Sequence, residues 1–332
     1  MSSSYVALYR KYRPQSFSDV VGQEQAVELL TSSIKQKKIS HAYLFCGGRG
    51  TGKTTVARIV ARDIGCNDED IIEIDAASNR GIDEIRELRE AVRTAPFSSP
   101  YKVYIIDEAH MLTKEAANAL LKTLEEPPSH VVFILATTDP EKLPSTIVSR
   151  CQKVVFKNPD MITLSSRLTH VAKEEGFDLH TDSAHLVALH GKGSYRDALG
   201  VLEQVLAVSD KKIDHEKVRE ILGTTELTTL VELLESVCKK DGKGIVGSIQ
   251  NLSKQNALRT YDDFIELVRQ GLLTRVGGAT ENEDLKRIAA EYPLIIGSKL
   301  VLGLLEKRHL LEVADTHSWT AFEAILLSFV EV

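Results

Sequence analysis

A glycine-rich stretch near the amino terminus has the residue types and spacing of a phosphate-binding loop. Residues 47–54 read GGRGTGKT, which satisfies the pattern G-x-x-x-x-G-K-[ST]. The stretch follows a short apolar run (42–46) and precedes apolar residues at helical spacing (56–64), so a strand, a loop and a helix are expected in that order. In this setting the backbone N–H groups of the loop and the helix N-terminus bind phosphate oxygens. A glycine-rich turn without a ligand is the alternative, and the strand-loop-helix order argues against it.

The loop therefore predicts a site for a nucleoside triphosphate with Mg²⁺. Lys53 is expected to bridge the β- and γ-phosphates, and the Thr54 hydroxyl to be a ligand of the metal. The predicted nucleotide contacts of the loop are Gly47, Gly48, Gly50, Thr51, Gly52, Lys53, Thr54 and Thr55.

Two carboxylates follow a second apolar run. Residues 103–108 read VYIIDE, which places Asp107 at the tip of an expected strand and Glu108 directly after it. Asp107 is predicted to hold the Mg²⁺ shell, and Glu108 to orient and polarise the attacking water. A solvated acidic loop is the alternative. His110, two residues on, is expected to be a packing or relay residue rather than a metal ligand.

The elements that must position these residues alternate between strands and helices. Short apolar runs, most of them rich in β-branched residues and typical of buried parallel strands, occur at 42–46, 71–74, 103–106, 131–135 and 154–156, and helical apolar spacing occurs at 56–64, 82–92 and 117–124. This order predicts a doubly wound α/β domain with a parallel sheet over residues 1–158. Strand patterns then stop, which predicts a small helical unit (159–220) and a longer all-α domain (221–332).

Composition excludes several classes of protein. The chain has 332 residues, 43% of them hydrophobic, and no apolar window approaches the roughly 18 residues of a membrane span. The first residues lack the pattern of a secretory signal. The four cysteines lie far apart with no C-x-x-C pair, so neither a disulfide framework nor a four-cysteine zinc site is expected, and a cytoplasmic location fits best.

Longer stretches of sequence carry a family resemblance. They are YRKYRPQSFSDVVGQ (9–23), HAYLFCGGRGTGKT (41–54), YIIDEAHML (104–112), NALLKTLEEPP (118–128), LATTDP (135–140), SRC (149–151) and GSYRDAL (193–199). Together they resemble the AAA+ clamp-loader ATPases, and among these the gamma/tau family of bacterial DNA polymerase III. The small subunits of replication factor C share only part of the set. The resemblance implies an α/β P-loop AAA+ domain, a helical lid and an all-α oligomerisation (collar) domain.

The resemblance also assigns roles to single residues. Arg150 resembles an arginine finger that completes the ATP site of a neighbouring subunit, although a surface salt bridge is the alternative. Thr138, in preference to Thr137, resembles the polar sensor that contacts the γ-phosphate or the attacking water. The alternative is a threonine at a strand end without such a role. Arg196, in a helix that Ser194 is expected to cap, resembles a second sensor. The segment with Tyr9, Arg13 and Val21 is expected to contact adenine. Arg80 and Thr113 are predicted DNA-backbone contacts, and a capped helix start with an exposed arginine is the alternative.

The function implied by the resemblance is ATP-driven opening and loading of a sliding clamp onto primer-template DNA. Its implied partners are other clamp-loader subunits in a heteropentamer-like ring, the sliding clamp and primer-template DNA. The implied location is the cytoplasm, at the bacterial nucleoid, and no membrane partner is expected. A non-hydrolysing scaffold, a replication factor C-like subunit and another AAA+ DNA motor are the alternatives. Polymerase activity is expected to belong to the holoenzyme and not to this chain, since the sequence has no group of carboxylates for nucleotidyl transfer besides those of the ATP site.

The sequence departs from most gamma/tau proteins at two places. Cys66 stands alone where those proteins carry a zinc module of four cysteines, so no bound zinc is expected. The long extension of tau forms is absent, which predicts correspondence to the short gamma form or to a shortened tau.

The net charge of −6 is unevenly distributed. Residues 1–158 carry 21 basic and 20 acidic side chains, and residues 159–332 carry 20 and 27. The predicted ATPase domain is thus close to neutral, and we expect DNA binding to belong to the assembly rather than to one isolated chain.

Overall fold

The structure is a computed structural model that describes residues 5–78, 87–88, 90–222, 227–253, 255–278, 280 and 282–330. Arg80 and most of the helix expected over residues 82–92 lie outside the described residues. The chain divides into two compact units, residues 1–218 and residues 219–332, and each is taken by itself below.

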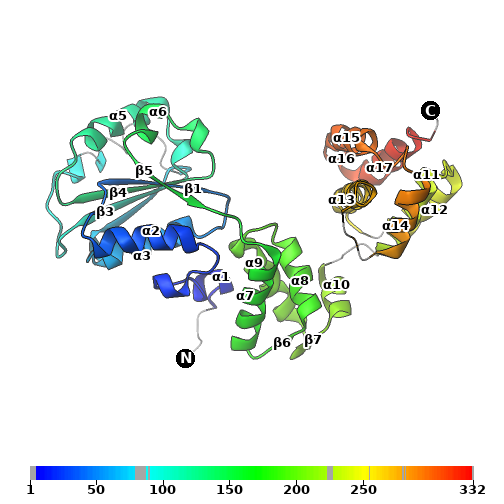
Figure 1. Cartoon of the computed structure of the whole chain (residues 1–332), viewed down its shortest axis with the longest axis horizontal. Helices are drawn as coiled ribbons and strands as arrows, with labels where there is room; N and C mark the ends of the chain where they lie inside the picture. Colours follow the sequence, from blue (N-terminus) through cyan, green and yellow to red (C-terminus); the bar gives the residue numbers. More distant parts are fainter. Residues whose placement is uncertain are drawn as a thin grey trace. The chain divides into compact units, whose positions relative to one another are not determined.

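A five-stranded parallel sheet forms the centre of the first unit (Figure 1). Its strands have the order β2-β3-β4-β1-β5. All five coincide with the predicted runs: β1 Ala42–Gly47, β2 Ile71–Asp75, β3 Lys102–Asp107, β4 Val131–Thr137 and β5 Gln152–Phe156. Because β4 pairs with both β1 and β3, the carboxyl ends of these three strands lie at one edge, where open α/β sheets bind their ligands.

Helices cover both faces of this sheet. In Figure 1, α2 and α3 lie against one face, and α5 and α6 against the other. Side chains of β1 alternate between the two layers: Tyr43 and Phe45 pack with α2 and α3, whereas Leu44 packs with α5 and α6. The helices are α1 Leu8–Lys11, α2 Glu24–Lys35, α3 Lys53–Asp63, α5 Lys114–Glu125 and α6 Ser145–Val148.

A helical lid completes the first unit. It consists of α7 Met161–Glu174, α8 Thr181–His190, α9 Tyr195–Val208 and the start of α10 His215–Leu222. Two short strands, β6 Asp178–Leu179 and β7 Lys212–Ile213, pair in parallel within it. The sequence reading expected helices alone here, which was wrong for this pair, because a two-residue strand has no apolar period to detect.

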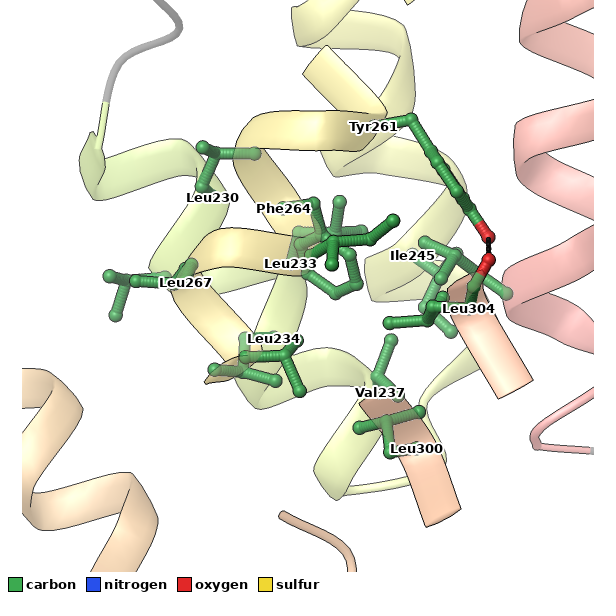
Figure 2. Close-up of a cluster of buried hydrophobic side chains, with 14 of the residues drawn as sticks. Leu230, Leu233, Leu234, Val237, Ile245, Tyr261, Phe264, Leu267, Leu300 and Leu304 are labelled. Atoms are coloured by element: carbon green, nitrogen blue, oxygen red, sulfur yellow. Dashed lines mark hydrogen bonds between the residues drawn. The ribbon is translucent and has the colours of Figure 1, made fainter. Parts of the chain in front are cut away.

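The second unit is helical throughout its described part. Its helices are α11 Leu227–Cys238, α12 Gly242–Leu252, α13 Ala257–Arg275, α14 Glu283–Glu291, α15 Ser298–Lys307, α16 His309–Ala314 and α17 Ser318–Leu327. Leucines of α11 meet Tyr261 and Phe264 of α13 in one buried cluster (Figure 2). The predicted order of an α/β P-loop domain, a helical lid and an all-α part is confirmed. Among all helices that the structure describes, none is long and apolar enough to cross a bilayer.

Candidate nucleotide-binding site

The glycine loop joins β1 to α3 as its sequence predicts. The strand ends at Gly47, and the helix begins at Lys53. Gly50 and Gly52 have φ of +69° and +100°, a left-handed conformation that favours glycine. A side chain on Gly47 would lie closer than 3.0 Å to the backbone oxygen of Phe156 on β5. The loop path therefore needs glycine both for its backbone angles and for the space beside β5.

Lys53 lies inside this loop. Its residue is 6% exposed, and its Nζ donates hydrogen bonds to the carbonyl oxygens of Gly47 and Gly48, both at 2.8 Å. Burial lowers the pKa of Lys53, and the carboxylates of Glu108 and Asp107 act in the opposite direction. A buried cation held by neutral carbonyls and facing two carboxylates suits the binding of a phosphate chain together with a divalent metal ion.

The predicted metal ligands are in direct contact. The Thr54 hydroxyl donates a hydrogen bond of 2.7 Å to Oδ2 of Asp107, and Oδ1 of the same carboxylate accepts from the backbone N–H of Glu108 at 3.0 Å. Mg²⁺ prefers oxygen ligands of this kind, usually one or two carboxylates together with phosphate oxygens and water. The residues therefore fit the metal that a nucleoside triphosphate brings with it.

A cavity opens beside the loop, between the N-terminal segment and the lid. The predicted residues that line it are Tyr9, Arg13, Val21, Gly50, Thr51, Gly52, Lys53, Thr54, Thr55, Asp107, Glu108 and Arg196. Gly47 and Gly48 are not in the lining, but they hold Lys53 through their carbonyls. The cavity thus joins most of the residues that sequence motifs named separately.

The lid closes one side of the cavity through the start of α9. Ser194 caps this helix by accepting from Asp197 N–H at 3.2 Å, as the sequence predicts, and Tyr195 N–H donates to the carbonyl of Gly50 at 3.1 Å. Arg196 reaches back to the N-terminal segment, where its guanidinium lies 5.8 Å from the ring centroid of Tyr9. The predicted second sensor therefore stands at the cavity, beside the aromatic ring expected near adenine.

Sequence reading missed several residues that join the N-terminal segment to the lid. Arg167 of α7 donates to the carbonyl of Tyr12 at 3.0 Å, and the Tyr195 hydroxyl donates to the carbonyl of Val21 at 2.9 Å. The Tyr12 hydroxyl bonds to Glu175, and burial together with that carboxylate raises the pKa of Tyr12 to about 12. These partners lie more than 150 residues apart, so no local spacing could have paired them.

The two candidate sensor threonines lie outside the cavity lining. The Thr138 hydroxyl donates to Oδ2 of Asp139 at 2.7 Å, whereas Thr137 is fully buried and bonds to Nδ1 of His110 at 3.0 Å. The preference for Thr138 as the sensor stays a prediction.

Arg150 does not line the cavity of its own chain. Its Nη2 pairs with Oε1 of Glu125 at 2.6 Å, and its Nη1 donates to the carbonyl of Thr146 at 2.8 Å. With about a third of its side chain exposed, Arg150 is held at the surface, and its role in trans stays a prediction.

Thr113 is the N-cap of α5. Its hydroxyl accepts from Ala116 N–H at 3.2 Å, so its structural role is established and its DNA contact stays a prediction. Cys66 is buried, and its thiol donates to the Tyr101 carbonyl at 3.3 Å. The absence of zinc remains a prediction as well.

Two family profiles match the first unit. The profile described as DNA polymerase III, delta subunit matches residues 22–79 and 67–160, and the ATPase lid domain of the DNA polymerase III clamp loader subunit matches residues 163–211. A DNA polymerase III subunit gamma of Buchnera aphidicola is 36% identical over 287 residues, which cover 80% of this chain and 79% of the relative. The chain belongs to the DNA polymerase III gamma/tau family.

Longer members of the gamma/tau family are similar over the same region. The tau subunits of Bacillus subtilis and Escherichia coli are 41% and 40% identical over 301 and 294 residues, which cover 84% and 82% of this chain. The same alignments cover 54% and 45% of the relatives, so the chain spans about half the length of these two tau subunits.

A solved structure supports the fold. The Holliday junction branch migration motor RuvB of Thermotoga maritima has a TM-score of 0.55, 19% sequence identity, and coverage of 68% of this chain and 79% of that chain. At this identity the likeness concerns the AAA+ fold alone.

Proposed function

We propose that this chain is an ATP-hydrolysing subunit of the clamp loader of DNA polymerase III. It would use ATP binding and hydrolysis to open a ring-shaped sliding clamp and to load it onto primer-template DNA. The observation that carries the proposal is the joined set of Lys53, Thr54 and Asp107 beside one cavity, in a chain of the gamma/tau family. A purely structural relative of the loader would have no need for that set.

The residues divide the work as follows. Lys53 and the backbone N–H groups of the loop bind the β- and γ-phosphates, while Thr54 and Asp107 hold the metal. Bound Mg²⁺ supplies neutralisation of the charge that develops on the phosphate oxygens. Glu108 orients and polarises the attacking water, since phosphoryl transfer depends mainly on positioning and electrostatics.

Arg150 acts on the neighbouring site in this proposal. Its guanidinium exchanges Glu125 for the γ-phosphate bound to an adjacent subunit, a type of contact that accelerates hydrolysis roughly 10³–10⁵-fold. Arg196 and Thr138 contact the nucleotide of their own chain. The partners are further clamp-loader subunits in a pentamer-like ring, the sliding clamp and primer-template DNA, with Arg80 and Thr113 near the DNA backbone.

The test is the ATPase rate of the reconstituted loader with clamp, with primer-template DNA and with both together. Strong joint stimulation is expected. Lys53→Ala should abolish ATP binding by this chain, whereas Arg150→Ala should keep binding and lose about 10³-fold in stimulated rate. Arg62→Ala is the matched control, because Arg62 is similarly exposed and pairs with Asp68 at 3.1 Å, away from the cavity.

The proposal fails if clamp and DNA do not stimulate hydrolysis together. It also fails if the isolated chain hydrolyses ATP at the full rate and Arg150→Ala behaves like Arg62→Ala. Stimulation by DNA alone would favour another AAA+ DNA motor.

A further inference from the structure

His110 lies in a partly buried position between the ends of two strands. It follows β3 in the short 3-10 helix Ala109–Met111, and only 10% of its side chain is exposed. Its Nδ1 lies 3.0 Å from the Thr137 hydroxyl and 3.5 Å from Oε2 of Glu108, and its Nε2 lies 3.4 Å from Oδ2 of Asp139. One imidazole therefore joins the carboxylate after β3 to two residues at the end of β4.

Glu108 needs such a neighbour. Its Oε2 is buried and has no hydrogen-bond partner among the residues that the structure describes, while the residue itself lines the nucleotide cavity. An uncompensated buried carboxylate oxygen is costly, so the carboxylate would turn toward any available donor. Nδ1 of His110 lies 3.5 Å from that oxygen.

The backbone of Glu108 is also constrained. Its φ is +48°, in the left-handed region that residues other than glycine seldom adopt, and its N–H is fixed by Oδ1 of Asp107. Strain of this kind persists where the surroundings enforce it, and such places cluster at functional sites. The backbone of Glu108 is thus fixed by Asp107, and its carboxylate lies 3.5 Å from Nδ1 of His110.

We propose that His110 is a positioning residue for ATP hydrolysis, which holds the Glu108 carboxylate in the orientation needed to polarise the attacking water. This inference rests on the hydrolytic function proposed above. Thr137 and Asp139, at the end of β4, contact the imidazole. The orientation of Glu108 then depends on β4, which lies in the sheet between β1 with its phosphate loop and β3 with its acidic pair. If His110 only filled space, its substitution would lower the stability of the protein but would not lower kcat while leaving the affinity for ATP unchanged.

The kinetic test compares three variants in the reconstituted loader. His110→Leu should lower kcat about 100-fold, the typical loss when a reacting group is misplaced by about 1 Å, while the affinity for ATP stays within about twofold because Lys53 and the loop are untouched. His110→Gln keeps an N–H donor at this position and should recover part of kcat. His130→Leu is the matched control, since His130 is at the surface of the same unit and bonds to the Thr94 carbonyl at 3.2 Å.

A double-mutant comparison isolates the link to Glu108. In a Glu108→Gln background, His110→Leu should lower kcat by less than about twofold, because residues that act as one unit give non-additive losses. Full additivity of the two losses would overturn the proposal. It would also be overturned if His110→Leu kept the wild-type kcat, or lowered ATP affinity as much as kcat.

Nuclear magnetic resonance of the ¹⁵N-histidine-labelled full chain gives a readout that needs no activity. Glu108→Gln should shift the ring nitrogen signals of His110 and leave those of His130 unchanged. An unchanged His110 ring would refute the contact itself. If the ring responds but the wild-type loader shows no ATPase stimulated by clamp and DNA, the proposed function fails while the contact stands.

Discussion

The buried hydroxyl of Tyr261 allows a quantitative test of the second unit. Tyr261 of α13 is fully buried, and its hydroxyl donates to the carbonyl of Leu304 at 2.8 Å (Figure 2). Leu304 lies in the last turn of α15, where helix carbonyls lack their usual partner N–H groups. Tyr261→Phe removes the donor and leaves a buried acceptor, whereas the ring keeps its edge contact with Phe322 at 4.8 Å.

The expected cost follows from the unpaired carbonyl. Leaving a buried hydrogen-bonding group without its partner costs about 1–3 kcal/mol of unfolding free energy. With a loss of about 2 kcal/mol and a urea m-value of about 1.5 kcal/mol/M, the unfolding midpoint of this unit should fall by roughly 1.3 M. The packing contribution is unchanged, so the shift isolates the hydrogen bond.

The assay uses the single tryptophan of the chain. Trp319 lies in the second unit, stacks on Phe322 at 5.7 Å and donates from Nε1 to the carbonyl of Gln255 at 3.2 Å. Its fluorescence during urea titration therefore reports unfolding of residues 219–332 and not of the nucleotide-binding unit. Tyr292→Phe is the matched control, because its hydroxyl bonds to Glu291 at the surface at 3.0 Å.

The control should change stability by no more than about 0.5 kcal/mol, as exposed substitutions usually do. Equal midpoints for the two variants would refute the reasoning, because the burial of the Leu304 carbonyl would then carry no cost. A larger loss in Tyr292→Phe than in Tyr261→Phe would refute it as well.

Two further predictions concern the loop and the acid stability of the second unit. Gly47→Ala should abolish binding of a fluorescent ATP analogue, because the new Cβ would overlap the Phe156 backbone oxygen. Gly200→Ala is the control and should bind the analogue normally, since a Cβ there meets nothing within 4 Å. Wild-type affinity in Gly47→Ala would contradict the loop geometry. Hydrogen bonds from Arg287 and Lys239 lower the pKa of Glu235 to about 2. Because the pKa is lowered, this stabilisation is complete above the ordinary value of 4.5 and is lost as pH falls toward 2. The difference in unfolding free energy between wild type and Glu235→Gln, followed by Trp319 fluorescence, should therefore shrink from pH 7 to pH 3. A difference that stays constant with pH would exclude the ion pairs of Glu235 as its cause.

The strands of the sheet could be predicted from the sequence because each of them has a local sequence pattern. Runs such as 103–106 and 131–135 are short, apolar and rich in β-branched residues, and all five predicted apolar runs are strands of one parallel sheet. The phosphate loop and the cap at Ser194 were predictable for the same reason, since their chemistry lies within a few consecutive residues. Local patterns therefore identified the loop, the acidic pair and the start of the lid helix.

Contacts between segments distant in sequence were beyond this kind of reading. The bond between Tyr12 and Glu175 and that between Arg167 and the Tyr12 carbonyl depend on how the N-terminal segment lies against the lid. The link from Glu108 through His110 depends on the register that places the end of β4 beside the end of β3. Such pairs follow from the tertiary arrangement and leave no periodic trace in either segment.

These distant contacts bear on how nucleotide and lid are connected. The N-terminal segment is tied to the lid by Arg167 and by the Tyr195 hydroxyl, while the backbone N–H of Tyr195 binds the Gly50 carbonyl of the phosphate loop. A ligand that contacts the loop, the segment and Arg196 together favours the one arrangement of lid and sheet in which all three face the cavity. Since a ligand shifts a conformational equilibrium only by its difference in affinity for the two states, the strength of such coupling is set by contacts outside the loop. It follows that the ligand's contacts with the segment and with Arg196, rather than those with the phosphate loop alone, set how strongly a bound ligand favours this arrangement of lid and sheet.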